Sequence, residues 1–90
     1  MSTPLQPFEP DHLIRLLYAQ YPHRTDLLRA LQLCSSGYWE TQQYFDFIGT
    51  RQSAATTIVE NIVLEDQQEG KIVVDVVADG RIAGIRYASR

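Results

Sequence analysis

Ninety residues suffice for one domain, and an apolar share of 44% is ordinary for a globular chain. The net charge of −3 and the pI of about 5.2 weigh against a nucleic-acid partner, since such binding relies on clustered basic side chains that neutralise phosphates. No apolar run approaches the roughly 20 residues that span a bilayer, and the N-terminus lacks a secretory pattern. Because the lone Cys34 cannot form an internal disulfide, the sequence predicts a cytoplasmic protein.

The first half of the chain predicts helices behind a tail. Residues 1–9, which contain two prolines, are expected to form a flexible tail. Pro10 or Asp11 opens a first helix because both residue types are favoured in a first helical turn, and Pro22 stops it. The apolar face of this helix repeats at helical spacing and comprises Leu13, Ile14, Leu17, Tyr18 and Tyr21.

A second helix is expected to begin at Thr25, a residue type favoured at the N-cap. Its buried stripe comprises Leu27, Leu28, Leu31 and Cys34. Gly37 is expected to end it in the left-handed cap conformation, where glycine is common.

An aromatic segment over residues 38–48 follows, and it holds five of the nine aromatic residues of the chain. Its spacing predicts a short third helix that ends at Gly49, although Tyr44–Ile48 alone also fits a strand. Aromatic residues are enriched both in cores and at interface hot spots. The segment is therefore either core or binding surface.

The second half predicts a three-stranded antiparallel meander. A linker over residues 50–56 precedes a first strand over residues 57–64, and a loop over residues 66–70 precedes two strands that flank Asp79-Gly80. Asp-Gly favours a two-residue type I′ turn, which needs positive φ at both positions. This turn would pair Ala78 with Arg81, Val76 with Ala83, Val74 with Ile85 and Ile72 with Tyr87, all on one apolar face.

The fold predicted from these elements is a single α+β domain over residues 1–90. Two or three N-terminal helices cover one face of the meander. Ile58, Ile62 and Leu64 of the first strand share one face with Glu60. The uncovered face of the hairpin carries Lys71, Asp75 and Arg86 beside the apolar Val73, Val77 and Ile82, and we expect a cross-strand ion pair between Asp75 and Arg86.

No pattern of a catalytic, cofactor-binding or metal site is found in the sequence. His12 and His23 have no neighbouring ligands at the spacing that a zinc site needs. Cys34 lies on an apolar helix stripe, where cysteine acts as a small buried hydrophobe more often than as a nucleophile. We therefore expect no cofactor, and the sequence favours a protein that is not an enzyme.

Four pieces of the chain together form a pattern: Tyr38-Trp39, Tyr44-Phe45-Asp46-Phe47, the run over residues 60–65 and the run over residues 79–85. In this pattern, which covers roughly residues 38–87, the chain resembles small uncharacterised proteins of cyanobacteria. The resemblance implies an accessory protein of the cytoplasm or the thylakoid periphery and assigns no site residues.

The sequence thus predicts a small non-catalytic module for protein–protein interaction, with self-association as one form of it. A small sheet with open edges and a partly apolar second face offers contact surface. The candidate contact residues are Trp39, Tyr44, Phe47, Val73, Val77 and Ile82. The alternative is a small-ligand-binding domain or minor enzyme with a pocket near Trp39 and Tyr44, where Asp46, Glu60 and Asn61 would supply polar groups.

Overall fold

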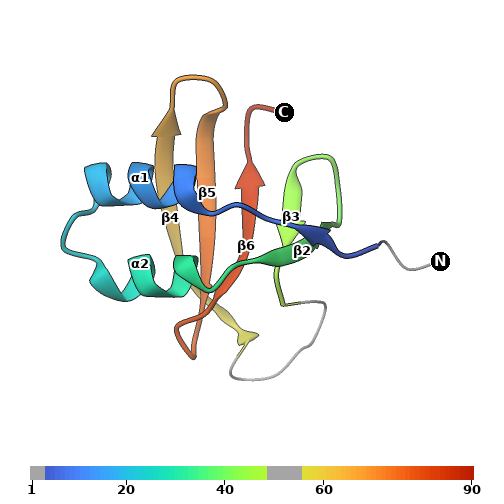
Figure 1. Ribbon diagram of the computed structural model, residues 1–90, viewed down its shortest axis with the longest axis horizontal. Helices are drawn as coiled ribbons and strands as arrows, with labels where there is room; N and C mark the ends of the chain where they lie inside the picture. The colour runs from blue at the N-terminus through green and yellow to red at the C-terminus, as the bar shows by residue number, and fades with distance from the viewer. Residues whose placement is uncertain (1–3, 49–55) are drawn as a thin grey trace.

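Two helices pack on one face of an antiparallel sheet in the computed structural model, which describes residues 4–48 and 56–90 (Figure 1). Within these residues the sheet has six strands in the order β1-β2-β3-β6-β5-β4. The elements are β1 (Gln6–Pro7), α1 (Asp11–Gln20), α2 (Thr25–Gln32), β2 (Ser36–Trp39), β3 (Tyr44–Asp46), β4 (Ile58–Asp66), β5 (Gly70–Val77) and β6 (Ile82–Tyr87). The chain is thus α+β, but the predicted three-stranded meander with two or three helices is wrong. The helix end expected at Gly49 and most of the linker expected over residues 50–56 lie outside the described residues.

The aromatic segment is the main source of this difference, because it forms two strands instead of a third helix. β2 and β3 pair antiparallel, with Tyr38 opposite Asp46 and Trp39 opposite Phe45. β3 also pairs with β6, so the segment extends the sheet. Aromatic side chains fit a pleated, half-buried surface, and strand alternation places the Phe45 and Phe47 rings on one face, where they contact each other.

The second helix ends earlier than predicted, at Gln32, and the chain then enters β2. Gly37 does not take the left-handed cap conformation, because its φ is not positive. Glycine is required there for close packing of β2 on β3: a Cβ at position 37 would lie 2.7 Å from Cε2 of Phe45. β1 pairs with the same strand, Gln6 lying opposite Gly37, so part of the predicted tail belongs to the sheet.

The turn between β5 and β6 is a three-residue loop, so the predicted two-residue type I′ turn is wrong. The N–H of Gly80 donates to the carbonyl of Val77 (2.9 Å), and the N–H of Val77 donates to the carbonyl of Arg81 (3.0 Å). Gly80 has a φ of 93°, whereas the φ of Asp79 is not positive. A type I turn followed by a left-handed glycine needs positive φ at one position only, and it spares Asp79 that conformation.

This loop shifts the strand register by one residue, and a β-bulge restores it. Next to the turn Val76 lies opposite Ile82, where the sequence predicted Ala83. The register shifts between Asp75 and Val76, and beyond that point the predicted pairs Val74–Ile85 and Ile72–Tyr87 are confirmed. Ile82 consequently lies with Val76 in the helix-side core and not on the opposite face, as the sequence predicted.

The core lies between the helices and strands β4, β5 and β6. Its fully buried members include Leu17, Leu27 and Leu31 from the helices and Leu64, Ile72, Val74 and Ile85 from the sheet. On β4 the shared helix-side face of Ile62, Leu64 and Glu60 is as predicted. Ile58 departs from it, since a register shift between Ile58 and Glu60 leaves this side chain half exposed.

Candidate interaction surface

The strand β4 carries a group of exposed aliphatic side chains. Ile58, Val59 and Val63 have 48%, 63% and 39% of their surface exposed. The other large hydrophobic residues that are exposed in the described part of the chain, Leu5, Tyr18 and Leu33, lie on three separate segments. Ile58 and Val59 are adjacent in this strand, and Val63 lies four residues further along it, beyond the exposed Asn61.

These side chains line an edge of the sheet. β4 pairs with β5 along one side and has no strand on the other side within the described residues. Alternate residues of an edge strand direct their main-chain groups away from the sheet. Figure 1 shows that α1 and α2 cross β4 and extend beyond it, so their outer ends lie over this edge. We call the edge of β4 together with Ile58, Val59 and Val63 the β4 surface.

The end of α1 caps the second half of this edge with side chains. Gln20 is bonded twice to one residue: its Nε2 donates to the carbonyl of Glu65 (2.8 Å), and its Oε1 accepts from the N–H of Glu65 (2.9 Å). The hydroxyl of Tyr21 donates to the carbonyl of Val63 (2.9 Å). Side chains thus satisfy three main-chain groups that a neighbouring strand would otherwise pair.

The connection between the helices is fixed to the same strand by an ion pair. Arg24 donates from Nη1 and Nη2 to the two carboxylate oxygens of Glu60 (2.6 and 2.8 Å), and it also contacts Asp26. The hydrogen bonds from Arg24 lower the pKa of both Glu60 and Asp26, while these carboxylates raise the pKa of Arg24. Because Arg24 and Glu60 are partly exposed, the fork geometry fixes position more than it adds stability.

The face of the sheet opposite the helices, called the outer face here, carries a polar network. Asn61 Nδ2 donates to Asp75 Oδ1 (2.5 Å), and Tyr44 is hydrogen-bonded to the same buried carboxyl group. Burial is the largest cause of the raised pKa of Tyr44, and the charge of Asp75 adds to it. Arg86 stacks over the Tyr44 ring at 5.2 Å, so the predicted ion pair between Asp75 and Arg86 does not form.

Two carboxyl groups adjoin this network. Glu40 is hydrogen-bonded to Asp46, which raises the pKa of Glu40 to about 7; burial and the charge of Asp46 add to the shift. Asp46 is buried and also accepts from the N–H of Ile48 (2.9 Å). In the described part of the chain, no group of three His, Cys, Asp or Glu residues could hold a metal ion.

Of the aromatic candidates, Trp39 and Phe47 lie on the helix side of the sheet and Tyr44 lies on the outer face. Trp39 packs edge-on against Phe45, with ring centroids 5.1 Å apart, and Phe47 packs against the core. Phe8, from the N-terminal segment, contacts both Phe45 and Phe47. These rings thus continue the core beyond the helices, and the structure does not gather the three candidates into one patch.

Of the aliphatic candidates, Val77 and Ile82 are buried and Val73 is half-buried. Val73 lies opposite Val63, which brings it next to the β4 surface. Sequence reasoning missed Gln20, Tyr21 and Val59. The β-branched run that contains Val59 is a signal for a strand, but no sequence pattern indicates which side chains cap the edge of that strand.

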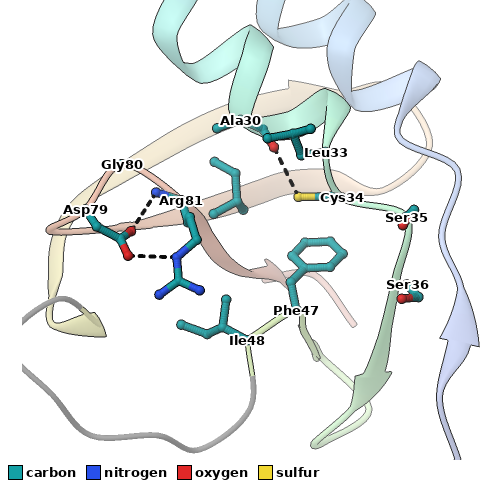
Figure 2. Close-up of a pocket in the computed structure, with 11 residues that line it drawn as sticks. Ala30, Leu33, Cys34, Ser35, Ser36, Phe47, Ile48, Asp79, Gly80 and Arg81 are labelled. Atoms are coloured by element: carbon teal, nitrogen blue, oxygen red, sulfur yellow. Dashed lines mark hydrogen bonds and ion pairs between the residues drawn. The ribbon is translucent and has the colours of Figure 1, made fainter.

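A surface pocket of about 450 Å³ lies between the end of α2 and the β5–β6 turn. Figure 2 shows Leu33 and Cys34 on one side of it and Asp79 with Arg81 on another; Arg81 Nε donates to Asp79 Oδ2 (2.7 Å). Burial raises the pKa of Cys34 to about 12, and its thiol donates to the Ala30 carbonyl (3.5 Å). The thiol is therefore held protonated, which does not suit a nucleophile.

A second hollow, of about 420 Å³, lies next to Arg86 and Arg90, which stack over Tyr44 and Trp39, the residues near which a ligand pocket is predicted from the sequence. Its lining is polar and comprises Thr41, Gln42, Gln43, Arg86 and Arg90. Arg90 stacks over Trp39 and is paired with Glu69 (2.6 Å). The lining thus differs from the mostly apolar pockets that hold small organic ligands.

No family model, curated protein or solved structure matches this chain. The resemblance to cyanobacterial proteins therefore stays a prediction. Among the described helices, none is long and apolar enough to cross a bilayer.

Proposed function

We propose that this chain is a small non-catalytic module for protein–protein interaction and that its contact region is the β4 surface. The observation that carries the proposal is the exposure of Ile58, Val59 and Val63 on one edge strand. Fully burying an aliphatic side chain of this size gains roughly 1.5–3 kcal/mol. Three of them therefore supply a useful part of the free energy of association.

The surroundings of these side chains fit an interface. Asn61 and Glu65 are exposed on either side of Val63, and Val73 extends the apolar surface onto the neighbouring strand. Interfaces commonly have an apolar centre with a polar rim. The single Cys34 is buried and unpaired, which fits a cytoplasmic setting.

The test is capture of a partner by surface variants of the chain. Val59→Thr with Val63→Thr keeps the β-branched shape at two exposed sites and removes apolar character. The matched control is Leu33→Thr, which alters an exposed aliphatic residue away from β4. The variants, each carrying an affinity tag, are expressed in the organism that encodes the chain, cross-linked and analysed by mass spectrometry.

We expect the wild type and Leu33→Thr to capture the same partner and the double variant to lose it. Recovery of the same partner by all three chains would contradict the proposed surface. All chains must keep the same melting temperature, so that a loss of capture cannot be due to unfolding.

A further inference from the structure

The side chain that caps Glu65 is itself an amide. The carboxamide of Gln20 donates one N–H and accepts at one oxygen, and these two bonds go to the carbonyl and the N–H of a single strand residue. This pattern matches that of two residues directly opposite each other in a hydrogen-bonded antiparallel pair. The edge of β4 thus already binds a group with the chemistry of a peptide backbone.

Strand alternation extends this observation along β4. Because the main-chain groups of Glu65 face Gln20, those of Val63 and Asn61 face the same side, away from β5. The carbonyl of Val63 accepts from Tyr21, which supports this assignment. The N–H of Val63 and both main-chain groups of Asn61 continue the row with no bond in the described part of the chain.

We infer that the edge of β4 binds an extended peptide segment of a partner protein by strand addition, with Gln20 and Tyr21 as the side chains that the segment displaces. The inference rests on the proposed function and names the kind of partner for the β4 surface. A strand that pairs with residues 61–65 replaces the three capping bonds by main-chain bonds and adds bonds at Asn61 and Val63. Gln20 is the exposed last residue of α1, so its side chain is free to move aside.

The chemistry of the edge also indicates the sequence of the segment. β4 carries Glu60, Glu65 and Asp66, and of these Glu65 has no ion-pair partner in the described residues. A lysine or arginine of the segment opposite Glu65 supplies one. Val63 lies two residues before Glu65, on the same face of β4. An apolar residue of the segment is therefore favoured opposite Val63, because apolar cross-strand pairs stabilise sheets.

The overhang of the helices argues for a partner other than a second copy of the chain. Antiparallel pairing of β4 with β4 of another copy has a two-fold axis perpendicular to the sheet, so both pairs of helices would lie on the same face. In each copy α1 and α2 extend beyond β4 (Figure 1), so the two overhangs would compete for the same space. A single extended segment fits under one overhang without this conflict.

The experiment uses the full chain and a fluorescent heptapeptide, KTVTKTV, blocked at both ends, whose lysines and valines alternate along one face so that a lysine can lie opposite Glu65 and a valine opposite Val63. A control peptide has the same sequence with N-methyl groups on alternate residues, which removes strand donors and leaves the side chains. Gln20→Ala removes the competing amide, and its matched control is Gln32→Ala, at the last residue of α2. Gln32 is also exposed and makes no hydrogen bond through its side chain in the described residues.

We expect the heptapeptide to bind and the methylated peptide to bind at least about tenfold more weakly. A loss of this size corresponds to the net free energy of one or two hydrogen bonds. Gln20→Ala should tighten binding by roughly five- to tenfold, because the net contribution of the competing bonds is lost. Gln32→Ala should leave it unchanged. Amide hydrogen exchange should slow at Asn61 and Val63 when the heptapeptide is added.

Other results would overturn the inference. One is equal binding of the two peptides; another is no binding to either the wild type or Gln20→Ala at millimolar peptide. Dimerisation of Gln20→Ala in sedimentation, with no peptide binding, would assign the edge to a second copy instead. If Val59→Thr with Val63→Thr loses its cellular partner but no peptide protects Asn61, the proposed function stands and strand addition fails.

Discussion

Tyr44 lies across Gly84, and its ring occupies the space that a side chain at position 84 would need. A Cβ at Gly84 would lie 2.5 Å from Cζ of Tyr44 and 2.7 Å from the main-chain oxygen of Phe45. The absence of a side chain at Gly84 therefore lets Tyr44 reach from β3 past β6 to Asp75 on β5. This contact joins three strands on the outer face.

Gly84→Ala should destabilise the protein by about 1–3 kcal/mol, since the methyl group forces the ring or the strand to shift. The combination of Gly84→Ala with Tyr44→Ala should lose less than the sum of the two single changes, because without the ring only the contact with the main-chain oxygen of Phe45 remains. Urea unfolding of the four chains measures both quantities. Additive losses would show that the contact with Tyr44 is not the cause.

Gly80→Ala should cost about 1–2 kcal/mol for a different reason. The φ of Gly80 is 93°, and no atom lies within 4 Å of a Cβ placed there, so the cost comes from backbone conformation alone. Gly80→Asn should cost less, because asparagine tolerates positive φ better than alanine. Thermal unfolding that ranks alanine above asparagine in stability would contradict the three-residue loop.

Phe45→Ala should cost about 3–5 kcal/mol, as expected for a large buried ring. Phe45 is buried, and its ring contacts Phe8, Trp39 and Phe47. Leu33→Ala, at an exposed site, serves as the control and should change stability by less than about 0.5 kcal/mol. Calorimetric unfolding of the wild type and the two variants measures the loss of stability in each variant. A loss at Phe45 no larger than that at Leu33 would mean that these rings do not form part of the core.

The hairpin shows how much of the fold the sequence predicts. Two apolar runs around a turn signal suffice to place Val74 opposite Ile85, because a one-residue slip would turn a whole apolar face to solvent. The predicted turn type was wrong, because the Asp-Gly pair fits both a two-residue and a three-residue loop. The bulge that compensates for the longer loop has no sequence signal.

The aromatic segment and the edge show where prediction fails. Spacing alone does not separate a short helix from two short strands, and the pairing of Trp39 with Phe45 depends on a turn without glycine or proline. The caps on β4 depend on Gln20 and Glu65, which are 45 residues apart. Such contacts follow from the packing of α1 on the sheet, and only the structure shows them.

The carboxyl pair of Glu40 and Asp46 predicts a dependence of stability on pH. The pKa of Glu40 is about 7 in the folded protein, above its ordinary value of 4.5, mainly because of the hydrogen bond with Asp46. The folded state then binds this proton more tightly than the unfolded state does. The stabilising contribution of the pair is fully present below pH 4.5 and is lost as the pH rises through about 7.

Glu40→Gln should remove this dependence, because the amide can donate to Asp46 at any pH. Urea unfolding between pH 5 and pH 8 should therefore show a fall in the free energy of unfolding for the wild type and a flatter profile for Glu40→Gln. The carboxylates whose pKa is lowered by arginine, such as Glu60, act in the opposite direction and below this window, and both chains share them. Parallel profiles for the two chains between pH 5 and pH 8 would show that Glu40 does not share a proton with Asp46.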